Sequence, residues 1–254
     1  MGQSPSTHGA SCGHAPPNSG AASGKSRVRA PLAEVQLRPV GEVEQGAYYG
    51  ARSACEPLHV QADPEGQVIA VNHTRAGLRN AVVSTQLLDL SGRRLGANRR
   101  ARLEVAPAAI AKAFSVPWTD GLPDLHLLRL TLEDGDGRLR SRNTYWRYRT
   151  PAAMRALGEA PRTKVSASVG RVSRSGLTAT VRNDGPAVAA MVRLSLTNGT
   201  TGDRMLPTLY SHNYLWLLPG ESQTVTLSWP ARALASGHPL LTAEAYNSRP
   251  STAR

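Results

Sequence analysis

The sequence contains few aromatic residues and few cysteines. Phe, Trp and Tyr make up 5% of its 254 residues, and Phe114 is the only phenylalanine. A core must therefore consist mainly of Leu, Val and Ala. Two cysteines, Cys12 and Cys55, provide neither a disulfide framework nor a zinc-ligand pattern. With 40% hydrophobic residues, the chain still has enough apolar material for one large domain or two of about 100 residues.

Long apolar runs are absent as well. No run approaches the roughly 20 residues that span a bilayer, and we expect no membrane partner. The N-terminal segment MGQSPSTHGASCGHAPPNSGAASGKSR lacks the apolar h-region of a secretory signal, so the sequence shows no export route and leaves the localisation open. Residues 1–45 are rich in Gly, Ser, Pro and Ala without apolar periodicity, which predicts a disordered tail.

Lysine is scarce in an otherwise basic chain. Only Lys25, Lys112 and Lys164 are lysines among 30 basic residues, and the formal net charge is +12. Such a charge is compatible with a binder of nucleic acid or another polyanion. No stripe of arginine interleaved with aromatic residues is present, however, and the densest arginine cluster surrounds an expected hairpin turn at residues 93–102. Polyanion binding is kept as an alternative function, and we do not expect a nucleic-acid partner.

Motifs for catalysis and metal binding are also missing. Glycoside hydrolysis needs two carboxylates in one cleft, but the Asp and Glu residues lie mainly at expected turns or on polar strand faces. No histidine pair has zinc spacing, and there is neither a Gly-x-Ser-x-Gly elbow nor a phosphate loop. Asp134 and Asp136 fit an Asp-Gly-Asp-Gly hairpin better than a calcium loop. We assign no catalytic, cofactor-binding or metal-binding residue and expect no cofactor.

What the sequence does contain is a series of short alternating segments between turn residues, a pattern typical of β-strands. In LHLLRLTLED, Leu128, Leu130 and Leu132 point one way and Arg129 the other, which predicts a half-buried strand with one polar face. Seven such segments lie before residue 150 and seven after residue 162. The sequence predicts an all-β fold of two tandem immunoglobulin-like β-sandwiches, preceded by the disordered tail and a short helix.

The same pattern sets the domain organisation. Residues 68–95 and 177–206 share an order of parts: a strand ending near Asn, a polar turn, a longer strand, and a Gly turn. This internal repeat supports two copies of one fold. The predicted organisation is a tail at 1–45, a helix at 46–56, a first sandwich at 57–150, a linker at 151–162, a second sandwich at 163–248 and a tail at 249–254.

Aromatic residues on a sandwich surface can stack on sugar rings, because a pyranose offers an apolar CH face to a π surface. Trp118, Tyr210 and Tyr214 are the candidates for such a contact, with Trp118 beside an expected turn. Trp146 and Trp216 lie in expected strands and are interpreted as core anchors. A stand-alone carbohydrate-binding module, with carbohydrate as its partner, is therefore a second alternative function.

The most distinctive segments are AYYGARSACEPLHVQ, VIAVNHT and SRNTYW, followed by MVRLSLTNGTTGDRMLPTLYSHNYLWLLPGESQTVTLSW. Together they resemble the region that follows the catalytic barrel in glycoside hydrolase family 2. The most similar subgroup is the exo-β-D-glucosaminidases, followed by the mannosylglycoprotein endo-β-mannosidases, and the resemblance covers residues 46–247. It implies that residues 46–56 are a remnant of the last helix of a (β/α)8 barrel, against which Tyr48 and Tyr49 would pack.

The resemblance also carries a functional prediction. The family's acid/base glutamate follows an asparagine on a barrel strand, and this chain has no Asn-Glu dipeptide; the nucleophile also belongs to the barrel. We therefore predict a non-catalytic C-terminal fragment that is no enzyme on its own. Its sandwiches would brace a separately encoded (β/α)8 catalytic domain in carbohydrate metabolism. The family is often secreted. Two departures are His212, where an acidic residue is expected, and Tyr145, where phenylalanine is expected.

Overall fold

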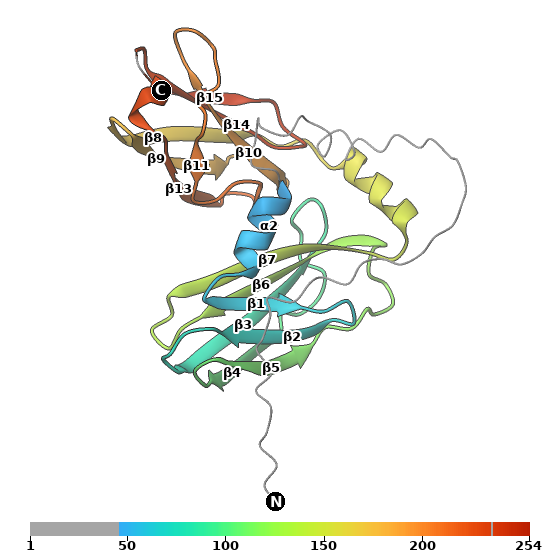
Figure 1. The fold of residues 1–254 in the computed structure, drawn as a ribbon. Helices are drawn as coiled ribbons and strands as arrows, with labels where there is room; N and C mark the ends of the chain where they lie inside the picture. The colour runs from blue at the N-terminus through green and yellow to red at the C-terminus, as the bar shows by residue number, and fades with distance from the viewer. Residues whose placement is uncertain (1–45, 235) are drawn as a thin grey trace, which may run out of the picture. The chain divides into compact units, whose positions relative to one another are not determined.

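Strands make up about half of the part of the chain that the computed structural model describes, residues 46–254 without residue 235 (Figure 1). The predicted disordered tail, residues 1–45, lies outside these described residues. Within them, the strands are accompanied by the α-helix α2 (Gly46–Ala54) and the 3-10 helices η1 (Pro151–Glu159) and η2 (Ala231–Leu234). The prediction of an all-β fold with a short helix in front is confirmed.

The first sandwich is formed by the strands before η1, each of which corresponds to one of the alternating sequence segments. They are β1 (Leu58–Ala62), β2 (Gln67–Asn72), β3 (Leu78–Leu88), β4 (Arg100–Val105), β5 (Ala109–Ser115), β6 (Leu125–Glu133) and β7 (Leu139–Tyr148). One sheet has the order β1-β2-β5 and the other the order β4-β3-β6-β7. All of the pairs are antiparallel.

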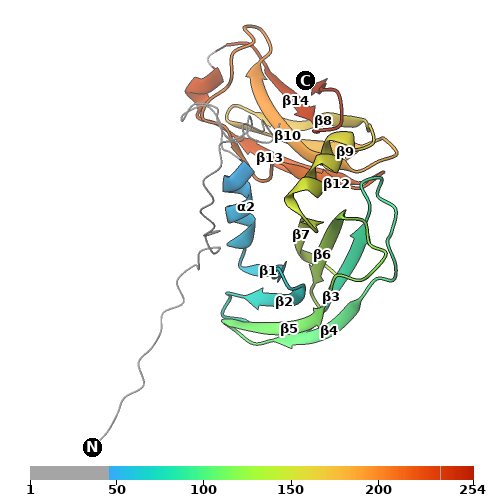
Figure 2. The same ribbon diagram turned by 90° about the vertical axis from the view of Figure 1, so that its right-hand side faces the viewer.

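The second sandwich follows η1 and also consists of two antiparallel sheets (Figure 2). Its strands are β8 (Val165–Ser173), β9 (Gly176–Asn183), β10 (Ala189–Asn198), β11 (Leu209–Tyr210), β12 (Leu215–Leu217), β13 (Ser222–Ser228), β14 (Pro239–Glu244) and β15 (Ser251–Ala253). The sheet orders are β11-β13-β9-β8 and β12-β10-β14-β15. Two tandem sandwiches of the immunoglobulin type were therefore correctly predicted.

Alternation along the strands builds each core. On β6, Leu128, Leu130 and Leu132 are buried between the two sheets of the first sandwich, as a period of two predicts. On the opposite face of the same strand, Arg129 is only 4% exposed, whereas Thr131 and Glu133 are partly exposed. The prediction of a half-buried strand with one polar face therefore fails at Arg129, which is covered by the second sandwich through Glu221.

Both sandwiches use a buried asparagine at the end of a strand to hold the next turn. Asn72 ends β2 and donates from Nδ2 to Ala76 O (2.8 Å); Asn183 ends β9 and donates to Ala187 O (2.7 Å). After the following long strand, the turn in each sandwich closes with an isolated β-bridge to an arginine. The repeat predicted between residues 68–95 and 177–206 is thus visible as shared hydrogen bonding.

The last strand lies in the segment that was predicted to be a tail. β15 pairs with β14, with Ser251 opposite Ala243, so the second sandwich extends beyond residue 248. Pro250 precedes this strand and interrupts the alternation, and three residues are too few to give a clear period of two. In the predicted linker, η1 buries Leu157.

Candidate functional site

Helix α2 packs against the second sandwich although it precedes the first sandwich in sequence. Tyr49 is 7% exposed and belongs to the core of the second sandwich, with its ring centroid 6.0 Å from that of Tyr214. The first residue of the helix, Gly46, lies beside the Tyr214 ring. At the other end of α2, Arg52 Nη1 donates to Tyr210 O (2.7 Å) on the short edge strand β11. These contacts fix the helix in a seat formed by β11 and the turn before β12.

The seat corrects the prediction for Tyr49. We expected Tyr49 to face a catalytic barrel, but its ring is buried among residues of this chain. Tyr210 is also a core residue, because its hydroxyl accepts a hydrogen bond from Leu196 N–H (3.0 Å). Tyr214 is half-buried against the same core. None of the three therefore has the exposed ring that sugar stacking or a contact with another domain requires.

Tyr48 lies on the opposite side of α2. Its side chain is 47% exposed, while its ring meets the edge of Tyr49 with centroids 5.2 Å apart. Ala51 and Cys55, three and seven positions further on, are exposed as well. This spacing places them on the same side of the helix as Tyr48. The outward side of α2, defined by Tyr48, Ala51 and Cys55, thus remains an apolar surface in the described part of the chain.

Where α2 ends, a polar network ties it to the first sandwich. Glu56 accepts a hydrogen bond from the Ser141 hydroxyl (3.1 Å) and lies 3.7 Å from His59 Nδ1. Desolvation lowers the pKa of His212 in the second sandwich, the charge of Glu56 opposes that shift, and the charge of Arg52 adds to it. The first sandwich therefore contacts the end of α2 through Glu56, and His212 lies within the electrostatic range of the same carboxylate.

A second polar cluster joins the two sandwiches directly. Glu221, between β12 and β13, accepts from Nη1 of Arg129 (2.8 Å) and from Nη2 (2.5 Å), and lies 2.7 Å from Nη1 of Arg142. Leu218 N–H also donates to this carboxylate (2.9 Å). Burial alone would raise the pKa of Glu221, but these hydrogen bonds and the two positive charges together hold the pKa below its usual value. The fork of Arg129 fixes the geometry as well as the charge.

Apolar residues surround this ion pair. Trp146 of β7 meets Trp216 of β12 edge to face, with centroids 5.7 Å apart and planes at 82°. Around them lie the apolar side chains Leu88, Leu90, Leu127, Val188 and Leu218. We call this cluster, together with Glu221 and its arginines, the joint. The two tryptophans were interpreted as core anchors, and the structure places them between the sandwiches instead.

Two residues of the joint, Arg129 and Glu221, were not singled out from the sequence. A charged residue in an alternating strand is normally solvated, and only the contact with the other sandwich reveals its role. The partial signal was Glu221 in the turn Pro-Gly-Glu-Ser, where its carboxylate reaches back to a backbone N–H three residues earlier. The identity of its arginine partners depends on how the two sandwiches meet.

Trp118 lies in the loop between β5 and β6 and is engaged by its own sandwich. The guanidinium carbons of Arg147 and Arg149 lie 5.3 Å and 5.0 Å from its ring centroid, and His126 meets it at 4.6 Å. Such cation–π and edge contacts anchor the loop on β6 and β7. Desolvation lowers the pKa of the buried His126, and the Pro123 carbonyl opposes that shift. Trp118 is therefore only half-exposed.

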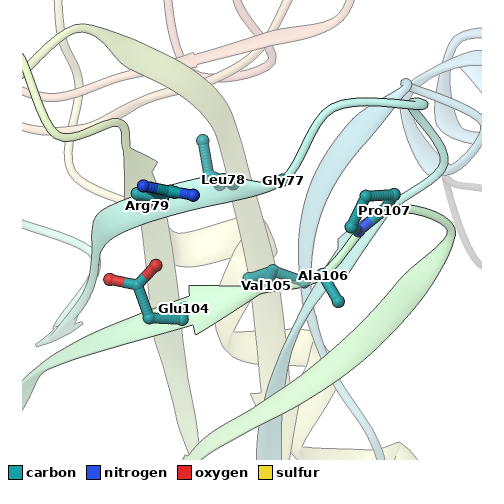
Figure 3. A pocket seen from close by; sticks show the side chains of 7 residues that line it. All are labelled: Gly77, Leu78, Arg79, Glu104, Val105, Ala106 and Pro107. Atoms are coloured by element: carbon teal, nitrogen blue, oxygen red, sulfur yellow. The ribbon is translucent and has the colours of Figure 1, made fainter.

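Cavities in the described part offer little for glycoside chemistry. One of about 430 Å³ lies at the β-bulge of β3 and is lined by Gly77–Arg79 and Glu104–Pro107 (Figure 3). Another, of about 770 Å³, lies between the start of β8 and β15. The first is lined by a single carboxylate, Glu104, and the second by none, whereas glycosidases use two. Neither lining contains an aromatic ring on which a sugar could stack.

The described residues offer neither a group of metal ligands nor a helix suited to cross a membrane. In the described ranges, no three His, Cys, Asp or Glu side chains are grouped so that they could hold a metal ion. No helix of the described chain combines the length and the apolarity that a bilayer crossing demands. Asp134 instead closes its hairpin by accepting from the N–H groups of Asp136 and Arg138.

Fold and site together define a module of two immunoglobulin-like sandwiches, locked by a joint and by a helix shared between them. Comparison with known proteins places this module in a particular group. Residues 143–248 match the family described as the exo-beta-D-glucosaminidase Ig-fold domain. That range includes the end of β7, η1 and nearly all of the second sandwich.

Relatives extend the similarity to most of the chain. An exo-β-D-glucosaminidase of Streptomyces avermitilis is 31% identical over 236 residues, which are 82% of this chain and 26% of the relative. One of Amycolatopsis orientalis is 29% identical over 229 residues, 80% of this chain and 22% of the relative. The resemblance to the tandem sandwich region of the exo-β-D-glucosaminidases is thereby confirmed, and the chain spans about a quarter of the length of these relatives.

Comparison with solved structures shows the same similarity. The exo-chitosanase CsxA of Amycolatopsis orientalis matches with a TM-score of 0.75 at 27% identity, covering 83% of this chain and 28% of that one. A β-D-mannosidase from Dictyoglomus thermophilum matches with a TM-score of 0.59 at 18% identity, which shows a shared fold. In these proteins the matched region is a minor part of a longer single chain.

Proposed function

We propose that this chain is a non-catalytic region of a family 2 glycoside hydrolase of the exo-β-D-glucosaminidase type. Its two sandwiches brace a (β/α)8 catalytic domain through the outward side of α2. The observation that carries the proposal is the seat of α2. One side of the helix is fixed on the second sandwich by Tyr49, while Tyr48, Ala51 and Cys55 present an apolar surface. A helix so fixed can carry another domain without moving relative to the sandwiches.

The joint supports the same role. A brace transmits position only if its parts are rigid, and a buried bidentate ion pair with edge-to-face tryptophans restricts sliding between the sandwiches. The hydrogen bond from the Ser141 hydroxyl to Glu56 adds a contact from the first sandwich to the end of α2. All three features converge on holding α2 and the two sandwiches as one body.

Carbohydrate binding by this chain alone is the alternative, and electrostatics argues against a glucosamine polymer as its ligand. Protonated amino groups are attracted by carboxylates, whereas this chain has a formal net charge of +12; like charges repel at short range. Trp118 is already in contact with two guanidinium groups. Affinity electrophoresis on chitosan, with and without Trp118→Ala, tests the alternative: retardation of the parent that is lost in the variant would favour it.

A chimera tests the bracing proposal. Residues 46–254 replace the matched region of the Streptomyces avermitilis enzyme, and both hydrolysis of an aryl β-glucosaminide and thermal unfolding are measured. We expect an active chimera in which Tyr48→Asp lowers the melting temperature of the catalytic domain, because a charge would be buried at the contact. Tyr148→Asp is the matched control, since Tyr148 is 46% exposed on the first sandwich against 47% for Tyr48.

Two outcomes would overturn the proposal. The first is an enzyme whose catalytic domain keeps its stability and rate when the whole matched region is deleted. The second is an equal effect of Tyr48→Asp and Tyr148→Asp. The isolated chain is assayed in parallel, and we expect no hydrolysis; a rate that disappears on substitution of a carboxylate of this chain would contradict its non-catalytic role.

A further inference from the structure

The cavity of about 770 Å³ between the start of β8 and β15 is lined by cationic and hydroxyl residues together with Val165 and Pro250. Its cationic and hydroxyl residues are Arg162, Thr163, Lys164, Ser248, Arg249 and Ser251. It lies at the edge where the two sheets of the second sandwich meet, well separated in sequence from α2 and from the residues of the joint. Neither the bracing role nor the similarity to exo-β-D-glucosaminidases assigns it a purpose.

Its positive charges are not compensated within the described residues. Among these, Arg162, Lys164 and Arg249 have exposed side chains and enter no ion pair. Asp184 is close to this edge, since its N–H donates to Lys164 O (2.8 Å), but its carboxylate is held by Arg182 at 2.9 Å. Three cations therefore line one hollow without a carboxylate among its lining residues.

The backbone that carries these cations is firmly held. Thr163, between two of them, donates its hydroxyl to Asn183 Oδ1 (2.7 Å) and its N–H to Asn247 O (3.1 Å). On the other wall, Ser248 donates its hydroxyl to Arg249 O (3.1 Å) and accepts from Ala245 N–H (3.0 Å). Because Asn247 and Ser248 are buried, the bases of the cationic side chains are preorganised, which reduces the entropy lost on binding.

We propose that this cavity binds a doubly charged oxyanion, a phosphate or sulfate group, through Arg162, Lys164 and Arg249. Arginine forks match the oxygen geometry of such groups, and lysine supplies a mobile point charge. The Ser251 hydroxyl is a further donor at the rim. The group can come from the free ion or from a phosphorylated sugar. The proposal does not depend on the bracing role of α2.

The scarcity of lysine provides a direct test on the full chain. Each lysine is acetylated with an activated ester, and peptide mass spectrometry measures the rate at each position. The concentration of inorganic phosphate is increased while sodium chloride keeps the ionic strength constant. We expect phosphate to slow the modification of Lys164 by about threefold or more, as expected when a charge-assisted contact engages the ammonium. Lys112, exposed on β5 of the first sandwich, is the internal reference and should react at an unchanged rate.

Variants connect the protection to the cavity. Arg162→Gln combined with Arg249→Gln should weaken phosphate protection of Lys164 by about tenfold, because two charge-assisted hydrogen bonds are removed. Arg171→Gln combined with Arg174→Gln changes the charge equally on the same sandwich outside the cavity, and should leave protection intact. Equal protection of Lys112, equal loss in both double variants, or protection reproduced by chloride would overturn the proposal. The same acetylation experiment with glucosamine 6-phosphate tests the source of the group. Protection of Lys164 at a lower concentration than with free phosphate would identify the sugar ester as the preferred ligand.

Discussion

The two sandwiches differ in how their cores are closed. In the first, β1 lies beside β7 and β4 beside β5, so its own strands cover both open sides between the sheets. In the second, β8 lies beside β14 and β15 on one side only. The other side is bounded by β11 and β12, which have two and three residues. There the core is completed by Tyr49 from α2.

This difference shows that the boundaries of a sandwich in sequence are not the boundaries of its core. The second sandwich needs a residue that precedes the entire first sandwich, whereas the core of the first is built from its own strands. Such an arrangement makes the stability of the second sandwich depend on α2. Of the two adjacent tyrosines of α2, Tyr49 completes this core and Tyr48 is exposed.

The largest effect is expected when Tyr49, which completes the core of the second sandwich, is truncated. Tyr49→Ala should lower the free energy of unfolding of the second sandwich by about 4 kcal/mol, since a buried aromatic side chain leaves a cavity. Peptide-resolved hydrogen exchange measures the loss in each sandwich separately, with β9 and β13 reporting on the second sandwich and β3 and β6 on the first. We expect the protection of β9 and β13 to fall while that of β3 and β6 changes little.

Tyr48→Ala is the matched control, with an expected effect of about 0.5 kcal/mol or less because the side chain is exposed. Equal losses in the two variants would show that the seat of α2 contributes nothing specific. Equal losses in both sandwiches would remove the asymmetry between their cores.

The joint should come next. Glu221→Gln leaves Arg129 buried without its counter-charge, and we expect a loss of about 3 kcal/mol in the free energy of unfolding. Glu244→Gln is the control, because Glu244 pairs with Arg193 near the surface, where such a pair contributes about 0.5 kcal/mol. Urea unfolding followed by tryptophan fluorescence reports on the joint through Trp146 and Trp216. Two separate transitions in the Glu221 variant, in place of one, would be the clearest sign of uncoupled sandwiches.

Much of this fold could be predicted from the sequence, because the strands of a sandwich alternate. Leu128, Leu130 and Leu132 reveal their strand by a local period of two, and the paired asparagine turns reveal the repeat. The residues that connect the parts have no local period. The sequence predicts a contact with another domain for Tyr49, because the residues that α2 contacts lie about 160 positions away in sequence. Arg129 was read as solvated because nothing in its own strand shows that Glu221 covers it.

Acid should weaken the first sandwich and the joint in different pH ranges. The pKa of His126, in the first sandwich, is lowered from 6.5 by desolvation, so the unfolded chain binds a proton that the native state does not. Its contribution is therefore present above pH 6.5 and is lost as the pH falls through the lower native value. The pKa of Glu221 is lowered from 4.5, so its contribution is lost only as the pH falls below that value.

The free energy of unfolding measured at several pH values separates these contributions. His126→Asn should flatten part of the decline that begins at pH 6.5, to which the lowered pKa of His212 in the second sandwich also contributes. Glu221→Gln should flatten part of the decline below pH 4.5. If His126→Asn leaves the first decline unchanged, burial of this imidazole is not the cause of the pH dependence of the first sandwich.

The smallest effect is expected at the exposed end of the seat. Arg52→Ala removes one hydrogen bond to Tyr210 O on β11, which is worth about 1 kcal/mol. Because β11 has only two residues, the loss should be local, with faster amide exchange at Ser211, whose N–H donates to Thr226 O across the β11–β13 pair. Arg171→Ala, on β8 of the same sandwich, is the control and should leave this exchange unchanged. If both variants exchange alike, Tyr49 alone fixes α2, and the closure of the second sandwich rests on a single aromatic side chain.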